Sequence, residues 1–357
     1  MLRNEYKLDT PLGAYLSQQQ HFCPNGLVGF VLAVETLQGY IDASGKEETV
    51  TDRILTVNGL LSTPSKWQEF DNHWQAFLRQ EGFKPDVKTG KYVFHTSPFW
   101  ANKCNLMPSG LTDHNKLRIY RRLIEIIRDH TLYRFGFGVF LEEFREIESE
   151  FPHVRESFLK KPGTRMALLC FRHNDEWAHS QGHTSLAYMF DRGDKFFGEM
   201  YSEYRQTINR AKEEGVDLDD LSISSITDGN KAIHSPLQGA DVLAWECRRY
   251  FQDLPSDVKR RQSLASHSFR PRYELRMLNT PGSCHLVLFG RDALRTEIRN
   301  VINSTVSDEH LEVLIGPDKP FDDVDELARS FFQMDKTTTV ADAKARQERA
   351  KARKAGQ

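Results

Sequence analysis

Three aspartates occupy positions where a charged side chain is unusual. Asp241 follows the segment Ser235-Pro236-Leu237-Gln238, which predicts a helix start with Ser235 as N-cap and Gln238 as its capping-box partner. Apolar residues recur along this helix at three- and four-residue spacing, and Asp241 lies at the edge of that apolar stripe. A carboxylate there loses hydration unless a cation, a metal ion or hydrogen-bond donors replace the water.

Asp42 and Asp191 each end a short apolar run that is expected to form a strand. Turn-forming residues follow both, Ala43-Ser44-Gly45 and Arg192-Gly193. Ligands of open α/β sheets bind at the carboxyl ends of strands, so both side chains are expected at one site if the strands are parallel neighbours. Three converging carboxylates repel one another, and Mg2+ or Mn2+ is the ordinary compensation. The structural alternative pairs Asp191 with an arginine such as Arg192, uses Asp42 as a turn cap and places Asp241 in a salt bridge.

The alternation of apolar runs and helical patterns predicts an α/β domain over the first two thirds of the chain. Helices are expected from Pro64, over Asp113 to His130, and from Ser235. Gly136-Phe137-Gly138 indicates a strand that another part of the backbone approaches closely. The expected strands are Leu37 to Asp42, Ile54 to Leu61, Leu132 to Phe140, Ser185 to Asp191 and Leu221 to Thr227, with a further short strand at His285 to Phe289.

Two of these segments resemble the signatures of a bacterial family known as "domain of unknown function 3800". Gly39-Tyr40-Ile41-Asp42-Ala43-Ser44-Gly45 resembles its opening YIDESG signature. Ser235-Pro236-Leu237-Gln238-Gly239-Ala240-Asp241-Val242-Leu243-Ala244 resembles its closing LQxADxxA signature. The resemblance spans Gly39 to Phe251 and also includes Phe94-His95, Phe190-Asp191 and Asp228-Gly229.

The resemblance implies a ribonuclease H-like mixed sheet flanked by helices, with two metal ions that serve phosphodiester cleavage. It implies that Asp42 bridges both ions and that Asp191 and Asp241 each help to hold one. His95 would orient the attacking water or accept its proton. The alternative for His95 is a strand-end histidine that bonds to backbone.

This chain departs from the family pattern at one place. The Asp-Glu pair of the opening signature is Asp42-Ala43 here, so one carboxylate is missing. Adjacent strand residues face opposite sides, so this loss need not empty the metal site. The other interpretation is a catalytically degenerate member of the family.

Other catalytic chemistries find little support in the sequence. His179 and His183 are four residues apart and, with His173, are the residues to weigh for zinc, but Gly182 weakens a helix there and no HExxH pattern occurs. Solvated histidines after a helix end are the alternative. No GxSxG elbow, GxGxxG loop or Walker A loop is present, and Cys247 lies on an apolar helix stripe.

The composition changes after Pro255. Basic residues gather there, which favours either contact with nucleic-acid phosphates or an ordinary solvated face. We expect a core over 1–257, a C-terminal appendage over 258–334 and a flexible basic tail over 335–357. The basic residues assigned to nucleic-acid binding are Lys259, Arg260, Arg261, Arg270 and Arg272.

The composition limits the classes of function. The 357 residues include 48 Lys and Arg against 50 Asp and Glu, so attraction of the whole molecule to nucleic acid is excluded and only a local patch would bind it. Five scattered cysteines fit a reducing, cytoplasmic setting, and no run is long and apolar enough for a membrane helix. We expect a metal-dependent nuclease. The rival is a non-catalytic interaction protein that contacts a protein partner or a second copy, for example in a phage-defence or mobile-element system.

Overall fold

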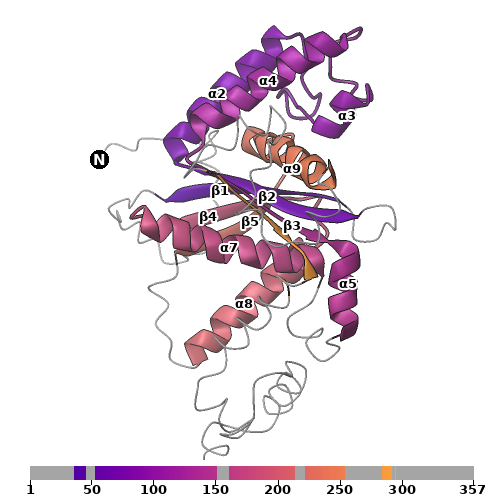
Figure 1. Cartoon of the computed structure of the whole chain (residues 1–357). Coiled ribbons are helices and arrows are strands. Elements are labelled where there is room, and N and C mark those ends of the chain that lie inside the picture. The colour runs from indigo at the N-terminus through magenta and orange to yellow at the C-terminus, as the bar shows by residue number, and fades with distance from the viewer. Residues whose placement is uncertain are drawn as a thin grey trace, which may run out of the picture.

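A single mixed sheet forms the centre of the computed structural model, which describes residues 36–45, 53–150, 161–213, 222–253, 284–291 and 294. Within these residues the strand order is β5-β4-β1-β2-β3-β6 (Figure 1). β2 is antiparallel to both β1 and β3, whereas β4 is parallel to β1, β5 to β4 and β6 to β3. The bounds are β1 Leu37–Ser44, β2 Ile54–Ser62, β3 Tyr133–Phe140, β4 Leu186–Asp191, β5 Ile223–Gly229 and β6 Cys284–Phe289.

The predicted α/β class is confirmed, with a mixed sheet flanked by helices. Each of the five strands expected before the Ser235 helix is present, and its ends lie within two residues of the prediction. The short apolar runs gave these positions because a strand buried on both faces needs apolar residues almost throughout.

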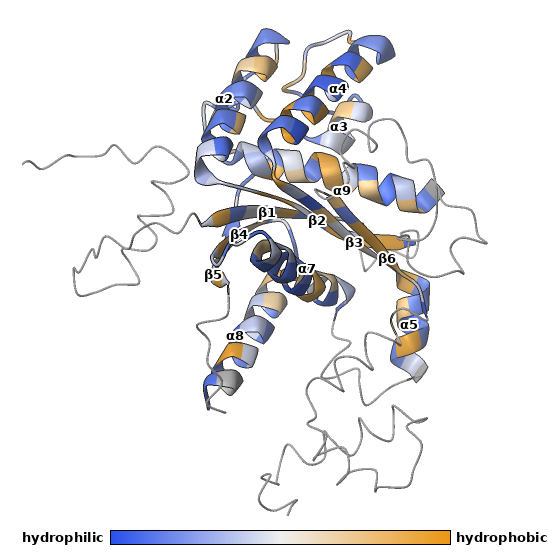
Figure 2. Cartoon of the chain, turned by 60° about the vertical axis from the view of Figure 1, so that its left-hand side comes forward, coloured by the Kyte–Doolittle hydropathy of each residue, from blue (hydrophilic) through white to orange (hydrophobic). Residues whose placement is uncertain are grey.

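Helices cover both faces of the sheet, with α2, α3, α4 and α9 on one face and α7 and α8 on the other (Figure 1). Polar and apolar residues alternate along these helices (Figure 2), as expected for helices that bury one side. The bounds are α2 Pro64–Gln80, α3 Thr96–Trp100, α4 Asp113–His130, α5 Leu141–Glu150, α7 Pro162–Ser180, α8 Phe197–Glu213 and α9 Ser235–Asp253.

Helix α9 packs across β1, β2 and β3, and two glycines of β3 allow its close approach. A Cβ at Gly136 would lie 3.1 Å from Cys247 Sγ, and one at Gly138 would lie 2.8 Å from the Phe251 ring. The expected strand is confirmed, but the atoms that approach its glycines belong to side chains and not to another part of the backbone. Cys247 and Phe251 are fully buried in this layer, as the apolar stripe of α9 predicts.

Strand β6 lies within the range that the sequence assigned to a C-terminal appendage. It pairs with β3 and extends the central sheet. Apart from residues 284–291 and 294, the 258–334 region lies outside the described residues, as do the tail over 335–357 and the basic residues Lys259, Arg260, Arg261, Arg270 and Arg272.

No helix in the described part of the chain combines the length and the apolar character that crossing a bilayer requires.

Candidate functional site: a cluster of carboxylates around Lys231

Asp42, Asp191 and Asp241 converge on the ammonium group of Lys231. Lys231 Nζ lies 2.9 Å from Asp42 Oδ1, 3.1 Å from Asp241 Oδ1 and 3.4 Å from Asp191 Oδ2. No two of these oxygens can be farther apart than about 6.5 Å, the sum of the 3.1 Å and 3.4 Å distances to their common neighbour. The structure therefore brings together the three acids that the sequence singled out.

The topology of the sheet explains this convergence. Within the sheet, β1 has β2 as its neighbour on one side and β4 on the other, and β5 follows β4. Asp42 and Asp191 lie near the carboxyl ends of the parallel neighbours β1 and β4, at the switch point where such sheets bind ligands. Asp241 reaches the same point from α9, which packs over β1.

Gln238 connects this helix to the segments around the site. Its Oε1 accepts hydrogen bonds from Trp74 Nε1 and Phe94 N, both at 2.8 Å. Its Nε2 donates to the backbone oxygen of Lys231 at 2.8 Å and to that of Tyr92 at 3.4 Å. The expected capping box is therefore wrong, because the amide is used by partners that are distant in sequence or lie in the preceding loop. Gln238 holds the Lys231 loop in position.

His95 lies at the rim of the carboxylate cluster. It precedes α3, and the next residue, Thr96, donates its backbone N–H to Asp241 Oδ2 at 2.8 Å. Burial lowers the pKa of His95, although Asp241 and Asp191 oppose the shift. The ring is therefore neutral near pH 7 and able to accept a proton. Phe99 N donates to the backbone oxygen of His95, and the ring makes no capping hydrogen bond to α3.

A fourth carboxylate, Asp194, belongs to the cluster and was missed by the sequence analysis. It lies in the turn after β4, where its backbone N–H donates to Asp191 O at 3.0 Å. Its carboxylate accepts a hydrogen bond from the Ala43 N–H, while its buried Oδ2 has no partner among the described residues. Burial, with repulsion from Asp191, raises the pKa of Asp194 to about 8. The spacing Asp191-Arg192-Gly193-Asp194 is the only sequence signal for it.

The charges of the cluster are only partly balanced. Burial raises the pKa of Asp42 well above its usual value, against the attraction of Lys231. Burial also acts to raise the pKa of Asp241, but Lys231 and the hydrogen bond from Thr96 outweigh it and hold that pKa below its usual value. Burial disfavours the Lys231 ammonium, yet the surrounding acids raise its pKa above the ordinary value. Lys231 therefore stays charged.

The structural alternatives for the three acids hold in part. Asp241 is in a salt bridge, with Lys231. Arg192 pairs with Asp228 at 2.6 Å and leaves Asp191 to Lys231, so the suggested Asp191–Arg192 pair is not the one that forms. Asp42 lies inside β1, two residues before its end, and pairs with Lys231.

The histidines weighed for zinc do not converge. His173 stacks on His285, His183 stacks on Trp177, and His179 Nε2 lies 2.8 Å from Ser222 Oγ. Among the residues that the structure describes, no three His, Cys, Asp or Glu side chains have the arrangement of a metal site. In the carboxylate cluster the central position is taken by Lys231 Nζ.

No protein-family model matches this chain, and a search of curated proteins finds no relative.

Proposed function

We propose that this protein is a divalent-metal-dependent nuclease with a ribonuclease H-like fold. The observation that carries the proposal is the convergence of Asp42, Asp191 and Asp241 on one point. They come from the first strand, a later strand end and the closing helix of the resembling region, which is the placement that the family resemblance implies.

The donor set suits a hard divalent cation. Asp42, Asp191 and Asp241 would hold Mg2+ or Mn2+, since carboxylate oxygens are the preferred ligands of both ions. The unpartnered Oδ2 of Asp194 is a further oxygen that a cation would satisfy. Lys231 Nζ now contacts the same oxygens, so ion and ammonium compete, and Lys231 must withdraw for the ion to enter.

The cluster has a further carboxylate close to the position of the missing one. Where the family signature has Glu, this chain has Ala43, and the backbone N–H of Ala43 binds the carboxylate of Asp194. Asp194 thus adds a fourth acid on the Asp42 side of the strand, whereas a side chain at position 43 faces the other side. This supports the catalytic interpretation over the degenerate one.

The remaining groups fit phosphodiester hydrolysis. Bound metal ions would lower the pKa of the attacking water and stabilise the leaving oxygen. His95 is neutral near pH 7 and lies beside Asp241, so it is placed to orient that water or accept its proton. Lys259, Arg260, Arg261, Arg270 and Arg272 would contact the phosphates of the substrate strand from beyond α9.

One observation favours the rival function, a non-catalytic interaction protein. The Lys231 ammonium already contacts all three acids, and the lysine side chain is only 11% exposed. The cluster therefore has an internal cation that partly offsets its charge without a metal ion. In this case the same fold would serve contact with a protein partner or a second copy of the chain.

A cleavage assay separates the two functions. Purified protein is incubated with labelled single- and double-stranded DNA and RNA in Mg2+ or Mn2+, with EDTA as the metal-free control. Asp241→Asn removes one acid of the cluster. Asp129→Asn is the matched control, because Asp129 is exposed on α4 and its carboxylate pairs with the neighbouring Arg128 at 2.9 Å.

Metal-dependent cutting that Asp241→Asn abolishes and Asp129→Asn retains would support the nuclease and identify its substrate. Absence of cutting on every substrate would favour the interaction protein. Cutting that survives Asp241→Asn would place the activity elsewhere.

A further inference from the structure

Part of the sheet face beside the carboxylate cluster is left open by the helices. On this face Gln38 and Tyr40 of β1 are in register with Ala187 and Met189 of β4. Ser225 and Thr227 of β5 continue the same two rows. Asp42 and Asp191 follow in the next row, because alternate strand residues face the same side. The open strands therefore form a floor that leads to the acids.

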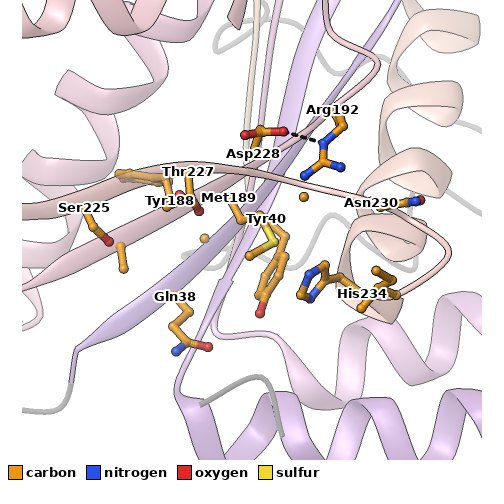
Figure 3. Close-up of a pocket in the computed structure, with 14 residues that line it drawn as sticks. Gln38, Tyr40, Tyr188, Met189, Arg192, Ser225, Thr227, Asp228, Asn230 and His234 are labelled. Atoms are coloured by element: carbon orange, nitrogen blue, oxygen red, sulfur yellow. Dashed lines mark hydrogen bonds and ion pairs between the residues drawn. The ribbon is translucent and has the colours of Figure 1, made fainter. Parts of the chain in front are cut away.

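A cavity of about 120 Å3 lies over this floor. The segment between β5 and α9 forms one wall, with Asn230, Ile233 and His234, and Arg192 with Asp228 closes one end (Figure 3). An engineered protein cavity of about 150 Å3 accommodates benzene, so this smaller space has room for at most one flat ring. The wall belongs to the same loop that carries Lys231 into the cluster.

A side-chain oxygen without a hydrogen-bond partner belongs to a residue that lines the cavity. Gln38 is 7% exposed and lines the cavity, and its Oε1 has no hydrogen-bond partner among the described residues. A buried polar atom without a partner costs about 1–3 kcal/mol, so such atoms usually have a ligand or water. The unpartnered oxygen of Gln38 points to a ligand that carries a hydrogen-bond donor.

The other lining side chains favour a flat, uncharged ligand. Figure 3 shows Tyr40, Met189 and His234 arranged around the cavity. Burial lowers the pKa of His234 to about 4, so its ring is neutral at pH 7. Among the described residues that line the cavity, Arg192 is the one lysine or arginine, and its Nε lies 2.6 Å from Asp228 at the end of the cavity. These residues therefore favour an uncharged group over an anionic one.

We propose that this cavity binds one unpaired nucleobase of a single-stranded nucleic acid whose backbone crosses the carboxylate cluster. The amide of Gln38 would pair with the hydrogen-bonding edge of the base, as glutamine amides do with adenine. Tyr40, His234 and the apolar edge of Ile233 would contact its faces, as in other proteins that bind splayed bases. The inference rests on the proposed function for the position of the backbone, but binding of the base can be measured without cleavage.

The test measures binding of fluorescent single-stranded homopolymers of each base, in DNA and RNA, to the full-length chain. All proteins carry Asp241→Asn so that no strand is cut. Gln38→Leu removes the amide that carries the unpartnered oxygen. Gln206→Leu is its control and makes the same change on α8, on the other face of the sheet. Ile233→Asp puts a charge at the cavity, where Ile233 is 46% exposed, and Val87→Asp is its control at a residue that is 97% exposed and does not line the cavity.

We expect at least one homopolymer to bind in preference to the others. Gln38→Leu should weaken that binding about five- to tenfold, the value of one hydrogen bond, and reduce the preference among bases. Ile233→Asp should weaken it too, while Gln206→Leu and Val87→Asp leave it unchanged. Because Ile233 is exposed, its variant keeps the test decisive if Gln38→Leu fails to fold.

Three results would overturn the base site: no homopolymer binds, all bind alike, or Gln38→Leu and Ile233→Asp act no differently from their controls. If both cavity variants act like their controls and the wild-type protein cleaves nucleic acid, the proposed nuclease is supported and the base site is refuted. Base-dependent binding without any cleavage would retain the base site and refute the nuclease.

Discussion

The substitution Lys231→Met removes the charge at the centre of the cluster and keeps an unbranched apolar side chain in its place. Lys231 Nζ lies 2.9 Å from Asp42 and 3.1 Å from Asp241, and the lysine side chain is 11% exposed, so solvent screens the pairs little. Removing one partner of a buried ion pair costs about 3–5 kcal/mol, because the remaining charge is buried without compensation. We expect a loss of about this size in the free energy of unfolding at pH 8 in EDTA.

The loss should depend on pH in a defined direction. Without Lys231 the carboxylates have higher pKa values in the folded than in the unfolded chain, where the value is about 3.9. Folded protein then holds protons that unfolded chain has released, so stability falls as pH rises from about 4 through the folded pKa values. The deficit of Lys231→Met is therefore small near pH 4 and largest at pH 8.

Urea unfolding in EDTA at pH 5 and pH 8 measures this deficit. Lys91→Met is the matched control, since Lys91 pairs with Asp71 at 3.4 Å but is 33% exposed, and such pairs contribute about 0–1 kcal/mol. A Lys231→Met protein as stable at pH 8 as the Lys91→Met protein would refute the electrostatic role of Lys231.

Three further predictions concern groups around the site. Gln238→Leu leaves the buried N–H groups of Trp74 and Phe94 without their acceptor and should lower the free energy of unfolding by about 2–6 kcal/mol, from about 1–3 kcal/mol for each donor; unchanged urea unfolding would contradict this. The pKa of His234 is lowered to about 4, chiefly by burial and also by Lys91 and Arg192 against Asp71, so the contribution of His234 to the free energy of unfolding should fall as pH decreases from 6.5 to 4. His234→Gln should flatten that part of the profile in thermal unfolding, and an unchanged slope would argue against it. Because the pKa of Asp194 is raised to about 8, it should cost stability as pH rises from 4 to 8, by at most about 1.4 kcal/mol per pH unit, and Asp194→Asn in EDTA should remove this slope in urea unfolding.

The parts of the fold that depend on local pattern could be predicted from the sequence. The ends of α4 agree with the expected Asp113 to His130, because its apolar period and its flanking residues are local signals. The strands ending near Asp42 and Asp191 were found for the same reason. Convergence of the three acids followed from a general rule about strand ends together with the apolar stripe of α9.

The parts that depend on distant contacts could not be predicted in this way. Lys231 lies in a loop without periodicity, and its role comes from three acids on three separate elements. Asp194 lies in a turn, where an acid is ordinary, and only the fold brings it to Ala43. Gln238 fits a local capping pattern, yet its hydrogen bonds go to α2 and to the segment before α3.

Titration of Mn2+ into the metal-free protein, followed by calorimetry, tests the central claim most directly. If the carboxylates form a metal site in competition with Lys231, the wild-type protein binds Mn2+, Asp241→Asn weakens the binding at least about tenfold, and Lys231→Met binds more tightly than wild type. Absence of Mn2+ binding in both the wild-type and the Lys231→Met protein, each shown to be folded, would contradict the metal site and with it the proposed nuclease.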